Sequence, residues 1–292
     1  MRLVKPKFSR EKFAFSATEC TRPPRTDDRI DGMDAKTHKL TKFLPSYVGS
    51  KAYWVGKLEQ YRGRDFVEFF AGSAVISAKL ARRAVLNDLD KFLYKYFRQY
   101  EDQPVMDKFT NEDYFAKRKQ KDWYRWLYYL QRMSFSGVYR WSKNGYNVPI
   151  KQDYKPKGEE GESKAVHLKD EIERSIKRFK ELAPALYNLD YRKVSIPENP
   201  DIAILDPPYE SKQAAYNVPP FDYEQYWKFV HRCMGLFRVV IVFDWDKNIR
   251  KHLNGRSCDT RKMRVNGKYD GATEAMCIID NDNPNPTTKG EE

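Results

Sequence analysis

An apolar run followed by an acid, two prolines and a tyrosine constrains this chain most. Ile202–Leu205 is short and apolar, which is typical of a buried strand in an α/β sheet. Asp206 follows at its carboxyl end, where open α/β sheets bind ligands. Pro207 ends the strand because it lacks an N–H, and it stiffens the turn because its ring fixes φ. The predicted shelf consists of Asp206, Pro207, Pro208 and Tyr209. It offers a carboxylate, a carbonyl and a flat ring, which can hold an exocyclic amine and stack a base. A proline-rich loop without a ligand is the alternative.

Further apolar runs predict the rest of an α/β fold. Predicted strands are 65–70, 84–86, 187–191 and 238–243, with a closing antiparallel pair at 263–265 and 275–279. Predicted helices are 52–61, 74–82, 168–183 and 223–236. No apolar run is long enough to cross a membrane, and four scattered cysteines with four histidines give no metal-ligand spacing.

A turn of small residues follows the first predicted strand. Phe70–Ala74 contains one glycine, and no GxGxxG or GxxxxGK[ST] pattern occurs in the chain, which favours a cofactor without phosphates. Glu68, Asp88 and Asp190 lie at or near the ends of three predicted strands, where a cationic or polyhydroxyl ligand would bind. Each of these acids is also compatible with a helix cap or a solvated surface.

Positive charge and aromatic rings gather in one part of the sequence. Residues 91–158 hold 15 Lys and Arg against 7 Asp and Glu, and therefore 8 of the net charge of +13. The same part contains Trp123, Tyr124, Trp126, Tyr128, Tyr129, Phe135, Tyr139 and Trp141. This mixture is compatible with a nucleic-acid surface and equally with a solvated basic face over an aromatic core. The Lys143–Gly145 step predicts a hairpin turn.

The motifs, in their order along the chain, resemble the Dam-like family (alpha group, D12 class) of S-adenosylmethionine-dependent DNA adenine-N6 methyltransferases. The matching segments are 47–51 (YVGSK), 67–72 (VEFFAG), 87–90 (NDLD), 135–140 (FSGVYR) with 145–149 (GYNVP), and 206–209 (DPPY). Phe69 replaces a usual proline, Ala74 a common glycine and Ser136 a frequent asparagine. The last departure leaves the recognised DNA sequence open.

The resemblance implies a Rossmann-like methyltransferase sheet with a closing antiparallel strand and an inserted, mostly helical recognition domain with a hairpin. Residues 36–95 and 165–280 would form the catalytic domain, residues 96–164 the DNA-recognition insertion, residues 1–35 an irregular arm and residues 281–292 a flexible tail. The implied partner is double-stranded DNA, and no membrane or metal is expected. The protein would be a monomer in the cytoplasm of a bacterial or phage-infected cell, where it would be associated with the nucleoid.

The resemblance also assigns roles to individual residues. The shelf residues Asp206, Pro207, Pro208 and Tyr209 would be catalytic. S-adenosylmethionine would be bound by Tyr47, Lys51, Glu68, Phe70, Ala71, Gly72, Ser73, Asp88, Asp190 and Tyr191. DNA would be bound by Phe135, Ser136, Tyr139, Arg140, Lys143 and Asn147.

The expected reaction moves a methyl group to N6 of a flipped adenine. Methylation of cytosine N4, methylation of adenine N6 in RNA, and a catalytically silent DNA-binding relative are the alternatives. The interpretation requires a pocket beside the shelf, and it fails if Asp206 is sealed in a purely structural ion pair.

Overall fold

The computed structural model describes residues 41–154, 164–209, 221–253, 258–265 and 268–282, all within one unit, Ala35–Glu292. The predicted arm (1–35) and residues 283–292 of the predicted tail lie outside the described residues. The strands are β1 (Asp65–Glu68), β2 (Arg83–Asn87), β3 (Trp141–Ser142), β4 (Gly145–Tyr146), β5 (Ala185–Tyr187), β6 (Ile202–Leu205), β7 (Val239–Trp245), β8 (Asp259–Val265) and β9 (Lys268–Asp280). The α-helices are α2 (Val75–Leu80), α3 (Lys91–Arg98), α4 (Asn111–Lys117), α5 (Leu127–Met133), α6 (Lys169–Leu182), α7 (Tyr223–Met234) and α8 (Asp246–His252). The 3-10 helices are η1 (Lys51–Tyr53), η2 (Val55–Tyr61), η3 (Tyr100–Asp102), η4 (Trp123–Trp126), η5 (Phe135–Gly137), η6 (Gln152–Tyr154) and η7 (Tyr191–Lys193).

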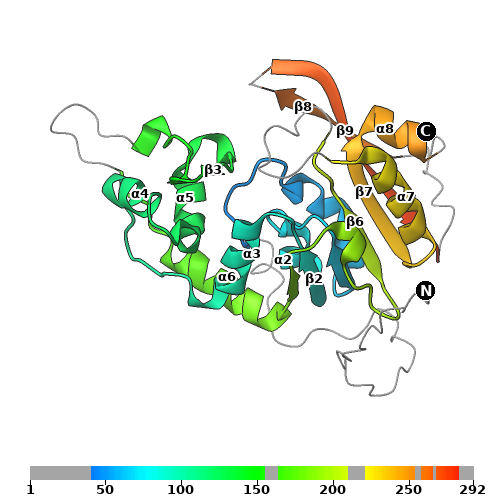
Figure 1. Ribbon diagram of the computed structural model, residues 1–292, viewed down its shortest axis with the longest axis horizontal. Coiled ribbons are helices and arrows are strands. Elements are labelled where there is room, and N and C mark those ends of the chain that lie inside the picture. Colours follow the sequence, from blue (N-terminus) through cyan, green and yellow to red (C-terminus); the bar gives the residue numbers. More distant parts are fainter. Residues whose placement is uncertain (1–40, 155–163, 210–220, 254–257, 266–267, 283–292) are drawn as a thin grey trace, which may run out of the picture. The chain divides into compact units, whose positions relative to one another are not determined.

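Seven strands form one sheet in the order β5-β2-β1-β6-β7-β9-β8 (Figure 1). The first five of these are parallel, whereas β9 runs antiparallel to both β7 and β8. The α/β class and the closing antiparallel pair are therefore confirmed. The third predicted strand lies earlier in the sequence than expected, because the apolar run Ala185–Tyr187 pairs with β2 and leaves Asn188–Asp190 as the turn that follows.

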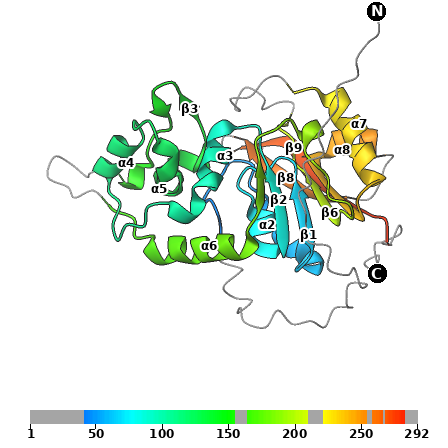
Figure 2. The ribbon, with the colours of Figure 1, turned by 60° about the horizontal axis from the view of Figure 1, so that its bottom comes forward.

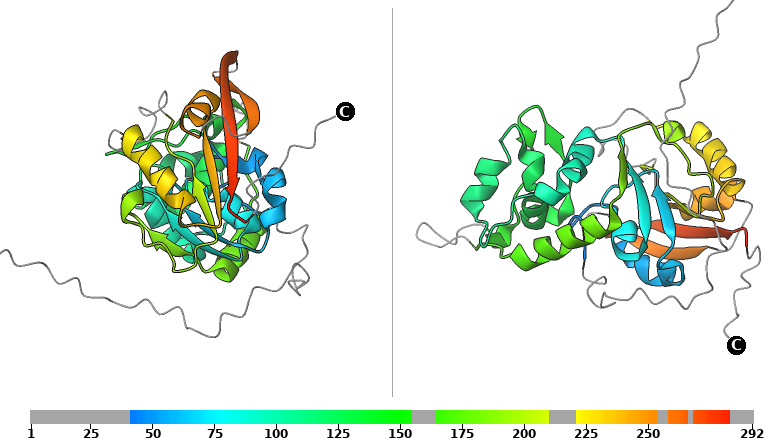
Figure 3. Two further views of the ribbon diagram at one scale, coloured as in Figure 1. Left: turned by 90° about the vertical axis from the view of Figure 1, so that its right-hand side faces the viewer. Right: turned by 90° about the horizontal axis from the view of Figure 1, so that it is seen from below.

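Both faces of the sheet are covered. One hydrophobic cluster includes Val230 of α7, Ile249 of α8 and Val240 of β7, and the other includes Leu58 of η2 and Ala78 of α2. Figure 3 shows the yellow and orange helices on the opposite side of the sheet from the blue segment. The strands β6 and β7 are buried on both faces, and both are apolar runs. Their one polar residue is Asp244 of β7.

The segment after the Tyr47–Lys51 motif is helical, as predicted, but it is not an α-helix. It forms the 3-10 helices η1 and η2 instead. The buried residues of η2 are Val55, Leu58 and Tyr61, which are three positions apart. This spacing places them on one face of a helix with three residues per turn, and therefore favours the 3-10 form over the α form.

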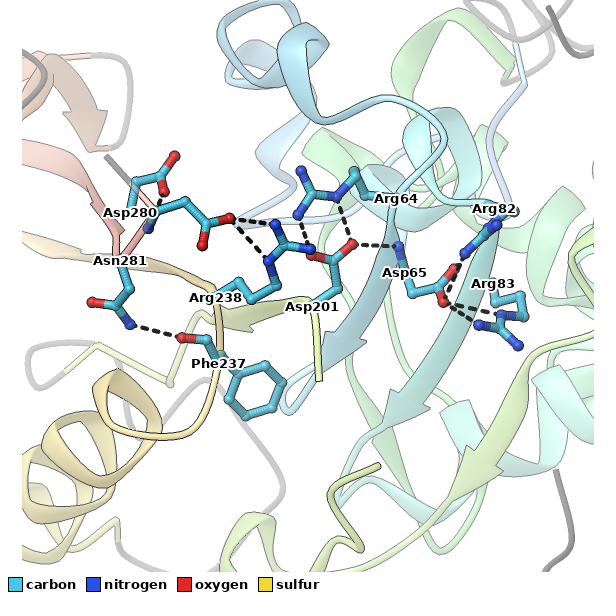
Figure 4. A network of polar contacts seen from close by, with 10 residues as sticks. Arg64, Asp65, Arg82, Arg83, Asp201, Phe237, Arg238, Asp280 and Asn281 are labelled. Carbon is cyan, nitrogen blue, oxygen red and sulfur yellow. Dashed lines mark hydrogen bonds and ion pairs between the residues drawn. The ribbon is translucent and has the colours of Figure 1, made fainter. Parts of the chain in front are cut away.

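Ion pairs join the amino ends of the parallel strands, at the edge of the sheet opposite the shelf. Arg64 donates to Asp201 between β1 and β6, with 2.6 Å from Nε to Oδ2, and Asp65 accepts from Arg82 and Arg83 (Figure 4). Arg238 binds Asp282. The Asn281 amide donates to the Phe237 carbonyl, so the first two residues of the predicted tail are bonded to the residues just before β7.

The segment between β2 and α6 holds α3, α4, α5 and the β3–β4 hairpin, grouped on one side of the sheet (Figures 1 and 2). The hairpin confirms the turn predicted from the sequence, with Ser142 paired to Gly145. Gly145 has φ 101°, and a side chain there would collide with the Arg118 carbonyl, so glycine is required.

Many rings of this segment are core residues. Trp123, Tyr128 and Tyr129 are buried, and Tyr129 stacks on Phe109 with 4.6 Å between ring centres. Other rings lie under lysines at the surface, including Trp126, whose ring centre is 4.3 Å from the Lys117 ammonium. The aromatic pattern therefore forms a core, with some of its rings carrying basic groups on their outer side.

No helix among the described residues is long and apolar enough to cross a membrane.

Candidate active site

The predicted shelf begins at the carboxyl end of the central strand β6. All four residues of β6 are buried, and the strand pairs in parallel with β1 and β7. Asp206 therefore emerges beside Glu68, the last residue of β1. Pro207 is buried, and the Pro208 carbonyl accepts a hydrogen bond from the Tyr223 hydroxyl of α7. The turn is thus fixed both by its prolines and by a contact to α7.

A pocket that is open to solvent lies between the shelf and the turn after β1. The predicted site residues that line it are Tyr47, Lys51, Glu68, Phe70, Ala71, Gly72, Ser73 and Asp206. The sequence prediction missed Gly49, Ser50, Val75, Ile76 and Ile204, which also line it. Gly49 and Ser50 could have been predicted, because they lie inside the Tyr47–Lys51 motif. The three apolar residues could not, because only the folded structure brings them to the pocket.

The turn between β1 and α2 has an unusual backbone. Gly72 has φ 49°, and a Cβ there would lie 3.1 Å from the Tyr47 ring. Ala74 also adopts the left-handed conformation, with φ 49° and ψ 32°. Because this conformation strains a residue with a side chain, glycine would be less strained than alanine at this position.

Glu68 is a buried carboxylate in the pocket wall. It is 4 % exposed, and its Oε1 accepts the Ser77 N–H of α2 at 2.8 Å. Burial raises the pKa of Glu68 to about 7, and the nearby charge of Asp206 adds to this rise. The side chain therefore titrates near neutral pH, and a bound cation would favour its ionised form.

The end of β2 contributes Asn87 and Asp88. Asp88 accepts the Gly72 N–H through Oδ2 and the Asp90 N–H through Oδ1, each at 2.9 Å. Burial raises the pKa of Asp88 to about 6. The Asn87 amide, which the prediction did not single out, donates to the carbonyls of Phe69 and Leu189. Asn87 thereby joins the turns that follow β1, β2 and β5.

Asp190 and Tyr191 follow β5 and do not line the described pocket. Asp190 accepts two hydrogen bonds from the Arg192 side chain, which lowers its pKa. The Tyr191 ring is buried 5.1 Å from the ring of Phe70, which does line the pocket. Asp88 and Tyr191 thus reach the pocket through one intermediate residue each, Gly72 and Phe70.

Asp206 forms an ion pair within the pocket wall. Its Oδ2 lies 2.7 Å from the Lys51 ammonium, and 20 % of its side chain is exposed. Burial raises the pKa of Asp206 to about 6, against the opposing effect of Lys51. Because its partner is itself a pocket residue and the carboxylate keeps part of its exposure, the pair belongs to the site and does not seal Asp206 away from it.

Glu274 of β9, which the sequence prediction missed, lies behind this pair. Its Oε1 accepts the Tyr209 hydroxyl at 2.8 Å and is 3.4 Å from the Lys51 ammonium. Its Oε2 accepts the Trp54 Nε1–H at 2.9 Å. Tyr209 is 6 % exposed, and its ring contacts Trp245. Its predicted role as a stacking face for a base therefore stays a prediction.

The six residues predicted to bind DNA lie in the hairpin or in the segments directly before and after it. Five of them are exposed: Phe135, Ser136, Arg140, Lys143 and Asn147. The Arg140 Nε donates to the Asn147 carbonyl across the base of the hairpin at 2.8 Å. The sixth, Tyr139, is half-buried.

Asp90 attaches this hairpin to the sheet. It caps α3 by accepting the N–H groups of Phe92 and Leu93, and it also accepts the Tyr139 hydroxyl at 3.0 Å and the Trp141 Nε1–H at 2.8 Å. A second link joins the segment before the hairpin to the Tyr47–Lys51 motif, since the Val48 N–H donates to the Gly137 carbonyl of η5 at 3.0 Å. The hairpin and the segment before it are therefore attached to the Asn87–Asp90 motif and to the Tyr47–Lys51 motif, respectively.

The fold is an α/β domain in which an acidic shelf borders a pocket that is open to solvent. A family model described as D12 class N6 adenine-specific DNA methyltransferase matches residues 47–233. The chain therefore belongs to this family, and it is an enzyme that methylates N6 of adenine in DNA at a specific site. A comparison with curated proteins gives no match. Within the described part of the chain, no three His, Cys, Asp or Glu side chains are grouped as metal ligands.

Proposed function

We propose that the methyl donor is S-adenosylmethionine, bound in the pocket between the shelf and the β1 turn, and that the acceptor is an adenine flipped out of double-stranded DNA. The observation that carries this proposal is the position of Asp206 in the wall of the same pocket that Glu68 and Gly72 line. Carboxylates suit a ligand with a sulfonium and an ammonium group, and the small residues of the turn let it approach the backbone. When bound, the donor supplies a methyl group that its sulfonium already activates.

Asp206 and Pro207 would act on the acceptor amine. The lone pair of adenine N6 is conjugated with the ring, which makes the amine a poor nucleophile. The Asp206 carboxylate accepts one N6 hydrogen bond and the Pro207 carbonyl accepts the other. Two acceptors favour a tetrahedral nitrogen and stabilise the positive charge that develops on it. The base leaves the duplex to reach them, and the Tyr209 ring provides the stacking surface.

The remaining site residues divide between the two substrates. Tyr47, Phe70, Ala71 and Ser73 surround the donor with Lys51, and Asp88, Asp190 and Tyr191 bind its nucleoside part. We further propose that residues 96–164 form the recognition insertion and residues 36–95 and 165–280 the catalytic domain. On this account the enzyme acts as a monomer, in the cytoplasm.

Donor binding should strengthen as the pH rises from 5.5 to 7.5 and then level off. Burial raises the pKa values of Glu68 and Asp88 to about 7 and 6, and a cationic donor binds their ionised forms. Below these values binding must release protons, so the affinity falls by up to about tenfold per pH unit for each carboxyl that must ionise. Titration by intrinsic tryptophan fluorescence measures this.

S-adenosylhomocysteine is the matched control for this titration, because it lacks the sulfonium charge. Its affinity should depend on pH more weakly than that of the donor. An equal affinity for the donor at pH 5.5 and 7.5, or no saturable binding at all, contradicts the assignment of the pocket.

Arg140→Ala should relax sequence preference more than it weakens binding. Arg140 is exposed at the base of the hairpin, and a bidentate contact from arginine to guanine discriminates by about 1–3 kcal/mol. Lys143→Ala, in the turn of the same hairpin, is the matched control. It should weaken binding to all sequences alike and reduce the salt dependence by about one counterion. Competition binding with a randomised duplex library measures both. A uniform loss of affinity for Arg140→Ala with unchanged preference argues against base readout.

A further inference from the structure

We propose that Glu274 of β9 is a positioning residue for methyl transfer, which holds the Tyr209 hydroxyl and limits how far Lys51 neutralises Asp206. The inference rests on the function proposed above, since it takes Asp206 as the group that accepts the adenine amine. Glu274 lies behind the shelf and does not line the pocket, so it acts through its neighbours.

The surroundings of Glu274 are those of a carboxylate built into the site. Its side chain is 2 % exposed, and both of its oxygens accept hydrogen bonds, Oε1 from Tyr209 and Oε2 from Trp54. Arg261 of β8 lies 3.6 Å from Oε2. Burial opposes its ionisation, but Lys51 and these hydrogen bonds outweigh burial and lower its pKa. Glu274 is therefore a buried anion.

Packing of β9 alone does not require a charge at this position. The next three residues of the strand, Ala275, Met276 and Cys277, are buried and supply its apolar contacts. A buried carboxylate costs free energy unless it is paired and hydrogen-bonded. The groups that compensate Glu274 include Lys51 and Tyr209, which also contact or border Asp206. This sharing connects β9 to the shelf.

The ammonium of Lys51 lies between two carboxylates. It is 2.7 Å from Asp206 and 3.4 Å from Glu274. With Glu274 ionised, the positive charge is divided, and Asp206 remains a strong acceptor for an amine that is becoming positive. Without the charge of Glu274, Lys51 would pair with Asp206 alone, so Asp206 would become a weaker acceptor and a stronger acid.

Other titratable groups around Asp206 belong to several elements. They are Lys51 of η1, Glu68 of β1, Tyr209 of the shelf, Tyr226 of α7 and Glu274 of β9, with Asp244 of β7 close to both tyrosines. The charge of Glu274 raises the pKa of Asp206, whereas Lys51 lowers it. Removing the charge of Glu274 should therefore lower the pKa of Asp206.

The test is Glu274→Gln, which keeps the shape and removes the charge. We expect kcat to fall by about 10- to 100-fold, as when partners that orient a metal ligand are removed, with smaller changes in KM for donor and DNA. The acid limb of the pH profile of kcat should move to lower pH. In the donor-free protein, ¹³C NMR of the Asp206 carboxyl should show its titration midpoint moving in the same direction.

Two further variants complete the experiment. Glu274→Asp keeps the charge, and the titration midpoint of Asp206 should return toward its wild-type value. This variant also tests the proposal should Glu274→Gln fail to fold. Asp201→Asn removes a carboxylate that binds Arg64 at the opposite edge of the sheet (Figure 4), and it should lower stability without moving the Asp206 titration.

Wild-type kcat in Glu274→Gln overturns the proposal. A fall in kcat with an unmoved Asp206 titration also overturns it, because that result describes a structural role. The NMR titration needs neither donor nor DNA. A failure of the proposed function, seen as no methyl transfer by the wild type, is therefore distinguishable from a failure of the role of Glu274.

Discussion

Asp206→Ala is expected to abolish methyl transfer while the protein still binds its donor and DNA. The Asp206 carboxylate is the acceptor that we propose for the adenine amine, and removing one preorganised group of this kind costs about 10²- to 10³-fold in kcat. Lys51 keeps Glu274 as a partner at 3.4 Å, so the variant should fold. Transfer of tritium from labelled donor to duplex DNA measures the rate.

Asp206→Asn and Asp201→Asn make this test specific. Asp206→Asn keeps the shape of the shelf but removes its charge, and it should be nearly as inactive as Asp206→Ala. Asp201→Asn breaks the ion pair with Arg64 at the far edge of the sheet, and it should keep the wild-type rate per folded molecule. Turnover close to that of the wild type in either Asp206 variant would refute the assignment.

Lys51→Met is expected to produce the largest loss of stability. Lys51 is 5 % exposed and, among the described residues, is the nearest cation to both Asp206 and Glu274. Removing one partner of a buried ion pair leaves an uncompensated charge and typically costs about 3–5 kcal/mol. Urea unfolding of the two proteins measures the difference.

The same variant should shift the pH dependence in the direction opposite to Glu274→Gln. Without Lys51, burial and Glu274 raise the pKa of Asp206 further above its value of about 6. The acid limb of activity should then move to higher pH. A carboxyl whose pKa is raised by folding stabilises the protein at low pH, and that contribution is lost as the pH rises through the folded-state pKa. The deficit in the free energy of unfolding should therefore be larger at pH 8 than at pH 5.

Lys57→Met is the control for this prediction. Lys57 lies in the neighbouring helix η2 and pairs with Asp259, but its side chain is 44 % exposed. Exposed pairs contribute about 0–1 kcal/mol. A loss of stability for Lys51→Met no larger than that for Lys57→Met would contradict a buried charge network at the shelf.

Most of the sheet was predictable because its strands are apolar runs that are followed by residues that end a strand. Ile202–Leu205, with Pro207 two residues after it, is an example, since both the strand and its end depend on neighbouring residues. The β3–β4 hairpin was predictable for the same local reason. The 3-10 form of η2 was not, because it depends on which residues face the sheet.

Within the site, the residues that sequence motifs carry were predictable and their supporting partners were not. Tyr47, Lys51 and Glu68 belong to short motifs, and all three line one pocket. Glu274 contacts Trp54 across 220 positions and Tyr209 across 65 positions of the sequence. No local pattern reports such a pairing. An acid directly before the apolar run 275–279 was the only available signal.

The most direct test of the central claim is the chemical identity and position of the product. Cells that express the wild-type chain or Asp206→Ala would have their DNA digested for mass spectrometry and read by modification-sensitive sequencing. We expect N6-methyladenine in one sequence context with the wild type and none above background with Asp206→Ala. Methylated cytosine as the product, or equal N6-methyladenine from both proteins, would contradict an adenine amine held by Asp206.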